Sequence, residues 1–314
     1  MKKFVLKISL FLVILWMLVS GFQYVIDKGL QKSTVGEYKE WNDIIKARIN
    51  ADLIVQGSSR ACFHVSPYVL DSVLQLNTYN LGLNGWAFQM QYYRLLLYLK
   101  HNKKPKYLIQ NVDHSTLNKN TELFGHNQFL PYLASDIIQT AVAPYMGVDW
   151  KDIYIPMYKY RSNDSLVLLG LQEYLGKSGG NNGKYKGFLA KDKLWETSFR
   201  QHQAANPSGI RTVVNPENRL LFEQYLKLCK AQNIQVIFVY TPEYIEAQRL
   251  IINRDSINTI FKNYASSYKI PFLDYSKDAI CLDTVNFYNS QHLNKIGTQK
   301  FNTKLAQDLK AYMK

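Results

Sequence analysis

The fold is first visible in the stretch Asp52-Leu53-Ile54-Val55-Gln56-Gly57-Ser58-Ser59. A short apolar run that ends in glycine is typical of a buried strand, and the serines then begin a new element. Residues 67–76 have helical spacing, residues 78–81 form a second strand-like run, and residues 88–99 form an amphipathic helix before a third strand at 107–112. This alternation predicts a parallel sheet with helices on both faces.

The same alternation returns in the last hundred residues. Strands are predicted at residues 234–240 and 270–274, and helices at residues 218–232, 256–268 and 295–313. Together with the first half, this pattern predicts an α/β fold, a three-layer sandwich around a central parallel sheet.

The first 26 residues predict a membrane anchor. Phe4–Ile26 is almost entirely apolar, with Lys7 as its single charge, and as a helix it would reach roughly 34 Å, enough to cross a bilayer. Lys2, Lys3 and Lys7 precede the apolar stretch, which predicts a cytoplasmic N-terminus and a main domain outside the cytoplasm, periplasmic or extracellular. A cleaved signal peptide is the alternative, but the apolar character continues past its usual length.

These patterns predict the domain organisation. We expect an anchor at residues 1–27, a polar stem at 28–50 and an α/β domain at 51–314. Residues 120–215 interrupt the alternation and are predicted to be an insertion, of the kind that often forms one wall of a site.

Composition narrows the partners and cofactors. The chain carries a net charge of +14, which suits anionic lipid or acidic glycan, while an exported domain without a recognition motif gives no reason to expect nucleic acid. Cys62, Cys229 and Cys281 are too few for a disulfide framework, although one disulfide of unassigned pairing stays open. The six histidines show no metal-binding spacing, so we expect neither a metal nor a cofactor.

Ligands on parallel sheets bind beyond the carboxyl ends of the strands, so the residues at those positions are the site candidates. A serine at a strand-to-helix turn and a late histidine suit a nucleophile and its base. Glycines after the second strand can present a bare backbone N–H, which suits an oxyanion hole. Taken singly, these residues are also typical helix caps and turn residues. The candidates are Ser59, Gly85 and His292.

At these positions the chain resembles the SGNH (GDSL-type) hydrolase superfamily, in its membrane-anchored subset associated with cell-surface polysaccharide modification. Gly57-Ser58-Ser59 resembles the first block, Asn80-x-Gly82-x-Asn84-Gly85 the second, and residues 287–294 the last, usually Asp-x-x-His-Leu-Asn. The resemblance covers about residues 50–120 and 215–314. It implies a flavodoxin-like SGNH fold, with Ser59 as nucleophile and Gly85 and the Ser59 N–H at the oxyanion position.

Two departures from the family pattern concern the site. The third block does not identify its oxyanion donor, for which Asn111 and His114 are the candidates. The position of the catalytic acid holds Asn289, and in a serine protease the exchange of this Asp for Asn costs about 10⁴ in rate. Asp274 and Asp283 could supply a carboxylate from nearby. The site could therefore be a working dyad, a triad with a displaced acid, or an inactive relative.

The resemblance and the predicted export imply an esterase or O-acyltransferase that acts on acyl groups, in particular acetyl groups, of cell-surface polysaccharide. Ser59 would be the nucleophile, His292 its base, and Asn289 would orient His292. One alternative is a weak or inactive protein that binds glycan or scaffolds polysaccharide export. Another is a lipid esterase, which the closeness of the anchor to the bilayer would favour.

Overall fold

In the computed structural model, which describes the chain except residues 87, 120–121, 123, 146–147, 178 and 314, five strands pair in parallel. Their order is β2-β1-β3-β4-β5, the flavodoxin-like order. The chain leaves β1 toward one edge and returns to β3 on the other side, so the crevice for a ligand is expected beside β1. The strands are β1 (Leu53–Gln56), β2 (Thr78–Asn80), β3 (Tyr107–Asn111), β4 (Gln235–Tyr240) and β5 (Phe272–Asp274).

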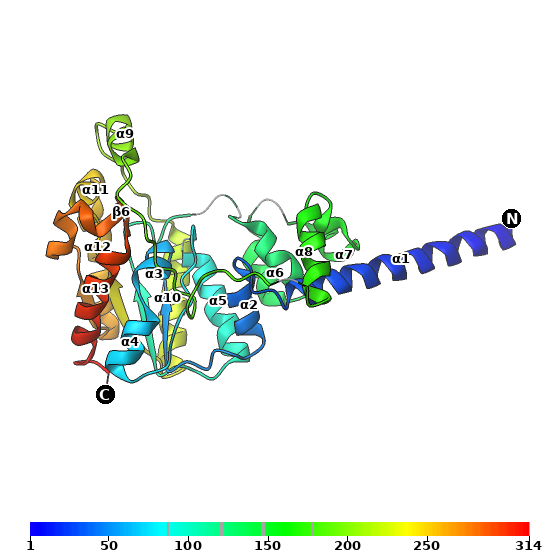
Figure 1. The fold of residues 1–314 in the computed structure, drawn as a ribbon, viewed down its shortest axis with the longest axis horizontal. Helices are drawn as coiled ribbons and strands as arrows, with labels where there is room; N and C mark the ends of the chain where they lie inside the picture. The colour runs from blue at the N-terminus through cyan, green and yellow to red at the C-terminus, as the bar shows by residue number, and fades with distance from the viewer. Residues whose placement is uncertain (87, 120–121, 123, 146–147, 178, 314) are drawn as a thin grey trace. The chain divides into compact units, whose positions relative to one another are not determined.

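Helices cover both faces of this sheet (Figure 1). The α-helices within residues 47–120 and 183–314 are α3 (Ser59–His64), α4 (Pro67–Leu74), α5 (Phe88–His101), α9 (Ser198–Ala205), α10 (Pro216–Ala231), α11 (Ile245–Leu250), α12 (Arg254–Tyr268) and α13 (Lys295–Leu309). Two 3₁₀ turns, η3 (Ala279–Leu282) and η4 (Thr284–Asn286), precede the short antiparallel pair β6 (Phe287–Asn289) and β7 (His292–Leu293). The predicted α/β fold with a central parallel sheet is confirmed.

The alternation of side chains along each strand explains the two faces. Val55 and Val239 point to one face, where they join a buried cluster with Leu305 of α13. Phe238 points to the other face, where its ring centroid lies 5.7 Å from that of Phe222 on α10. Burial of one such side chain contributes about 1.5–3 kcal/mol, so these two layers supply much of the stability of the fold.

The chain divides into two units. One holds residues 47–120 and 183–314 and contains the sheet, and we call it the sheet unit. The other, which we call the N-terminal unit, holds residues 1–46 and 121–182. Its elements are α1 (Lys2–Leu30), α2 (Tyr38–Ile45), η1 (His126–Tyr132), α6 (Asp136–Val142), α7 (Trp150–Tyr154), η2 (Tyr158–Tyr160) and α8 (Asp164–Tyr174).

The N-terminal unit has its own core. Trp41 of α2 is fully buried, with its ring 5.5 Å from that of Phe129 and its Nε1–H donating to Gln128 at 2.9 Å. α1 enters this unit only at its C-terminal end, where Ile26 and Leu30 are buried. The region predicted as a polar stem thus contributes α2 to a folded unit, because Trp41 and its neighbours give the helix an apolar side within a polar sequence.

The predicted insertion at about 120–215 is shared between the units. Residues 121–182 belong to the N-terminal unit, and residues 183–215 belong to the sheet unit. Within the described residues, α1 is the single helix long and apolar enough to cross a membrane, with a mean hydropathy of 2.3 over its best window.

Candidate active site

Ser59 lies at a sharp turn between β1 and α3. Gly57 has φ +150°, and a Cβ there would lie 2.7 Å from the Cβ atoms of Ala61 and Asn111, so the turn requires glycine. Ser58 is in extended conformation before the helix, and Ser59 is the first residue of α3. The predicted nucleophile thus stands at the carboxyl end of β1, where the strand order places the crevice.

His292 comes from the other end of the sequence and meets Ser59 at this turn. It is the first residue of β7, just ahead of α13. Its Nε2 atom lies 2.7 Å from Ser59 Oγ, although 233 residues separate the two. This is the distance and the pairing that a hydroxyl nucleophile and its base require.

Asn289 faces the second nitrogen of the imidazole. Its Oδ1 lies 2.9 Å from His292 Nδ1 and also accepts the backbone N–H groups of Gln291 at 3.1 Å and His292 at 2.9 Å. A backbone N–H can only donate, so the atom at this position must be the carboxamide oxygen. Nδ1 therefore carries the proton, and Nε2 is left to accept the Ser59 hydroxyl.

The two alternative acids serve other roles. Asp283 accepts the backbone N–H of Val285 at 2.9 Å and thereby caps η4. Asp274 accepts the backbone N–H of Ser276 at 3.0 Å. Neither carboxylate has a described hydrogen bond to His292, so the displaced-acid case has no support in the described part of the chain.

Rings surround His292 on several sides. The ring of Tyr288 stacks on it, with centroids 5.4 Å apart and planes 8° apart, and Phe63 meets it edge-on at 5.5 Å. Burial, reinforced by the Arg60 and Lys191 charges and opposed by Asp113, lowers the pKa of His292 to about 4. The imidazole is therefore neutral near pH 7, which is the form that accepts a proton.

His64 holds the loop that carries His292. Its Nε2 accepts the backbone N–H of Leu293 at 3.0 Å, so its proton sits on Nδ1, which lies 3.0 Å from Thr241 Oγ1. Burial, with the neighbouring Arg60 and His292, lowers the pKa of His64 well below its usual value, which keeps this pattern of donor and acceptor fixed. Sequence reasoning missed this residue because a histidine at the end of a short helix carries no signal of its own.

The four oxyanion candidates fall into two groups. Gly85 lies in an exposed turn with φ +79°, on a loop whose Leu83 N–H donates to the Gly57 carbonyl at 2.9 Å. That bond holds the second block against the turn that carries Ser59. The Ser59 N–H is at the first residue of α3. The role of these two N–H groups as oxyanion donors stays a prediction.

The side chains of Asn111 and His114 contact residues outside the dyad. The Asn111 amide donates to the Val239 carbonyl at 3.0 Å and lies 3.4 Å from Thr241 Oγ1, and the side chain is buried between strands. His114 Nδ1 lies 3.4 Å from Thr212 Oγ1, and its Nε2 lies 3.8 Å from Glu243. Among the described residues neither side chain has a hydrogen bond to Ser59 or His292, and an oxyanion role for either stays a prediction.

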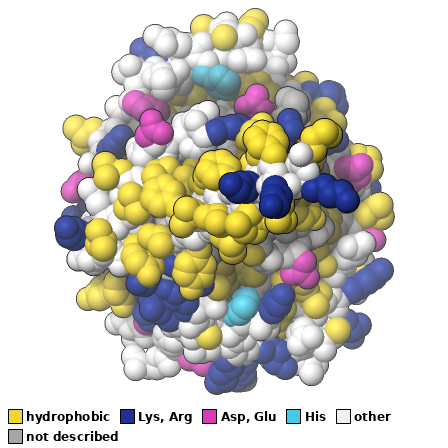
Figure 2. Space-filling model, turned by 90° about the vertical axis from the view of Figure 1, so that its right-hand side faces the viewer, with side chains coloured by type: hydrophobic (Ala, Val, Ile, Leu, Met, Phe, Trp, Pro, Cys, Tyr) yellow, Lys and Arg dark blue, Asp and Glu magenta, His cyan; other side chains and the backbone are white. Residues whose placement is uncertain are grey.

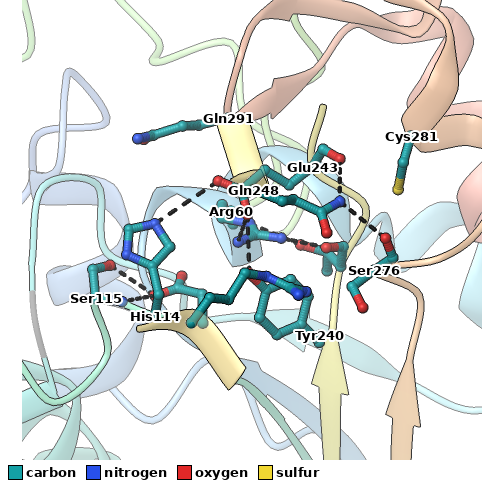
Figure 3. A network of polar contacts seen from close by, with 12 residues as sticks. Arg60, His114, Ser115, Tyr240, Glu243, Gln248, Ser276, Cys281 and Gln291 are labelled. Atoms are coloured by element: carbon teal, nitrogen blue, oxygen red, sulfur yellow. Dashed lines mark hydrogen bonds and ion pairs between the residues drawn. The ribbon is translucent and has the colours of Figure 1, made fainter. Parts of the chain in front are cut away.

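A buried charged network adjoins the dyad (Figure 3). The Arg60 Nη1 lies 3.3 Å from Glu243 Oε2, which also accepts the Tyr240 hydroxyl at 2.9 Å. The guanidinium lies over the Tyr240 ring, 4.7 Å from its centroid, and both ions are buried. Asp113 lies nearby and accepts the Ser58 hydroxyl at 3.3 Å. Burial raises the pKa of Asp113, but the Arg60 charge and other neighbours lower it, and the net result is a lowered pKa.

A cavity of about 560 Å³ opens on the same side of the sheet unit. Ser290 and Gln291, which directly precede His292, form part of its lining, as does Glu243. The predicted insertion contributes to the wall through residues 199–215. The basic side chains that line it are His114, Lys119, His202 and Arg211.

Cys62, Cys229 and Cys281 are free and buried. Within the described residues, no three His, Cys, Asp or Glu side chains are placed to hold a metal ion.

No family model and no protein of curated function matches the sequence. Among solved structures, a provisionally assigned acylhydrolase from Bacteroides fragilis is similar at 11% identity and a TM-score of 0.38. A GDSL-like lipase from Bacteroides thetaiotaomicron is similar at 10% identity and a TM-score of 0.35. Each comparison covers 83% of this chain and 88% of the other. Both likenesses are distant, so the case for an activity rests on the geometry around Ser59.

Proposed function

We propose that this chain is a membrane-anchored SGNH-type esterase or O-acyltransferase that acts on acyl groups, in particular acetyl groups, of cell-surface polysaccharide. One observation carries the proposal: the imidazole of His292 bridges Ser59 Oγ at 2.7 Å and Asn289 Oδ1 at 2.9 Å. This is a nucleophile, a base and an orienting group in the order that acyl transfer requires.

The reaction would proceed in two steps. Ser59 Oγ attacks the acyl carbonyl and passes its proton to His292 Nε2. The ester C–O bond then breaks, and the leaving sugar hydroxyl takes the proton from Nε2, which leaves an acyl-serine. A water molecule, or the hydroxyl of a second sugar, gives its proton to Nε2 and attacks the acyl-serine. The bond between the acyl carbon and Ser59 Oγ then breaks, and Nε2 returns the proton to Ser59 Oγ, which restores the free serine. Water as the second reactant makes the chain an esterase, and a sugar makes it an acyltransferase.

The negative oxygen of each tetrahedral intermediate needs N–H donors. We assign them to the backbone N–H groups of Ser59 and Gly85. Supporting this assignment, the Ser59 N–H has no acceptor among the described residues, and the Gly85 loop is bonded to the same turn. Removal of one such donor costs about 10²–10³ in rate in a comparable hydrolase.

The location of the substrate follows from two features. α1 would anchor the chain in the membrane, with residues 28 onward outside the cytoplasm, because lysines precede its apolar stretch. The cavity lined by Ser290 and Gln291 also has Lys119 and Arg211 in its lining, which suits a glycan that carries acidic groups.

The test is turnover of acetylated polysaccharide and of small acetyl esters by the full-length chain in lipid nanodiscs. Ser59→Ala should lower the rate by about 10³-fold or more, because no other group can form the acyl intermediate. Ser58→Ala is the matched control and should change the rate by less than about tenfold. If Ser59→Ala keeps the native rate, the mechanism is wrong.

A second function is favoured by Asn289 itself. A neutral carboxamide gives the imidazolium no charge stabilisation, and Arg60 and Lys191 further lower the pKa of His292. Such a site also suits a protein that binds glycan without turnover, or that scaffolds polysaccharide export. Retained glycan binding with no turnover by the native chain would favour it. Faster turnover of long-chain than of acetyl esters would instead favour a lipid esterase.

A further inference from the structure

The outer side of α8 is unusually apolar. Leu168 and Leu175 are seven residues apart, which places them on the same side of the helix, and Gly170 is the one buried residue of α8. Leu168 is 57% exposed, and Leu175, which follows α8, is 63% exposed. A helix on the surface of a water-soluble protein would turn such a stripe toward the core. Here the core side is occupied by the contact with α1.

α7 adds aromatic side chains to the same unit. Trp150 is 60% exposed and Tyr154 is 66% exposed. Lys151 Nζ lies 5.9 Å from the Trp150 ring centroid. Exposed tryptophan and tyrosine beside lysine is the composition of protein surfaces at the headgroup level of a bilayer.

The contacts with α1 indicate the depth at which these elements would lie relative to a membrane. The Met157 N–H, between α7 and η2, donates to Gln23 Oε1 at 2.6 Å. A Cβ on Gly170 would lie 2.7 Å from the Ile26 side chain, and Lys159 Nζ lies 2.9 Å from Asp27 Oδ2. Because the apolar stretch of α1 ends at Ile26, α8 and the segment that follows α7 meet α1 where it would leave the hydrocarbon.

The contact between α1 and α8 fixes the position of α8 along α1. A Cβ on Gly29 would lie 1.7 Å from the Gly170 carbonyl oxygen, so the two helix backbones touch. Without a side chain between them, α8 has no room to slide along α1. Viewed from the N-terminal end of α1, hydrophobic side chains gather in the middle of this face, with Lys and Arg side chains beside them (Figure 2).

We propose that the collar formed by Trp150, Tyr154, Leu168 and Leu175 is immersed in the headgroup layer of the leaflet that α1 leaves. The occupant of this surface is lipid, because the collar continues the apolar surface of α1 and carries lysine at its margin. This inference rests on the proposed membrane anchor. It makes the N-terminal unit a membrane-bound platform, with two contacts to the bilayer in place of one.

The test measures depth in the membrane with nitroxide labels on the full-length chain in vesicles of phosphatidylcholine and phosphatidylglycerol. Leu168→Cys and Leu175→Cys label the collar, and Val13→Cys labels the middle of α1. Leu220→Cys is the matched control, a leucine that is 61% exposed on α10 of the sheet unit. The native cysteines are buried, and the unsubstituted chain measures their background labelling.

Collar labels should collide with oxygen in preference to a water-soluble nickel chelate. We expect their ratio of oxygen to nickel accessibility to exceed that of the Leu220→Cys label at least about fivefold, with the Val13→Cys label higher still. Collar labels that match Leu220→Cys while Val13→Cys is in lipid would overturn the collar and leave the anchor standing. Labels shielded from both reagents would show a protein partner and overturn it too. A Val13→Cys label in water would overturn anchor and collar together.

Discussion

Ser59 and Arg60 are neighbours in sequence but belong to groups with opposite electrostatics. Ser59 begins a relay of neutral side chains through His292 to Asn289. Arg60 is held in a buried ion pair with Glu243, which Tyr240 also contacts. The site thus contains carboxylates, but they neutralise the guanidinium and do not hydrogen-bond to the imidazole. The comparison teaches that the surroundings of His292 keep its imidazole neutral. The buried charge is carried instead by Arg60, the residue that follows Ser59, and by its partners.

The strongest test of this contrast gives the relay a charge. In Asn289→Asp, a carboxylate would stabilise the imidazolium, so ester turnover should rise by between about 10-fold and 10⁴-fold. The pH profile should move as well. Native activity is lost only as pH falls through the His292 pKa of about 4, because the neutral imidazole is the active form. A carboxylate raises that pKa, so the acidic limb should move upward.

The measurement is the rate from pH 3 to pH 9 for the native chain and the variant. Ser59→Ala combined with Asn289→Asp is the control and should abolish the gain. An Asn289→Asp variant with the native rate and an unmoved acidic limb would mean that Asn289 does not act through His292.

The second test removes charge from the network. Glu243→Gln would leave Arg60 buried without its counterion, which should cost about 3–5 kcal/mol in the free energy of unfolding. Denaturant unfolding of the full-length chain in detergent measures this loss. Glu217→Gln, at an exposed glutamate in the first turn of α10, is the matched control and should stay within about 0.5 kcal/mol. Equal stability of the two variants would contradict the view that this ion pair holds the site together.

The smallest effect is expected where the ring of Tyr288 supports the relay. Tyr288→Leu removes the stacked ring, and an aromatic pair of this kind is worth about 0.5–1.5 kcal/mol, or about 2- to 12-fold in rate. Tyr288→Phe keeps the ring and should remain within about twofold. Turnover in nanodiscs measures both. The idea fails if Leu and Phe at this position have the same rate, because the ring would then not position His292.

Much of the sheet unit could be predicted from local patterns. The strand at residues 52–56 and that at 234–240 are short apolar runs bounded by turn residues, so periodicity identifies them. Ser59 and His292 could be predicted to lie close together because parallel strands bring their carboxyl ends to one edge of the sheet.

Other parts could not be predicted, because they depend on contacts between distant segments. Glu243 and Arg60 are 183 residues apart, and nothing in either stretch signals that they pair. The place of Asn111 at the end of β3 is visible in the sequence, whereas its bond to the Val239 carbonyl on β4 is not. The N-terminal unit was missed because its two segments lie on either side of the first three strands.

The contact between Gly29 and Gly170 bears on how the chain would respond to the thickness of a bilayer. α1 is continuous from Lys2 to Leu30, and its last turn is clamped against α8 with no space for a methyl group. The joint therefore has no hinge. Helices tilt to match bilayers of different thickness, and here a tilt of α1 would swing the N-terminal unit by the same angle. The anchor would then set the orientation of the N-terminal unit relative to the bilayer, whereas a flexible linker would set only its distance.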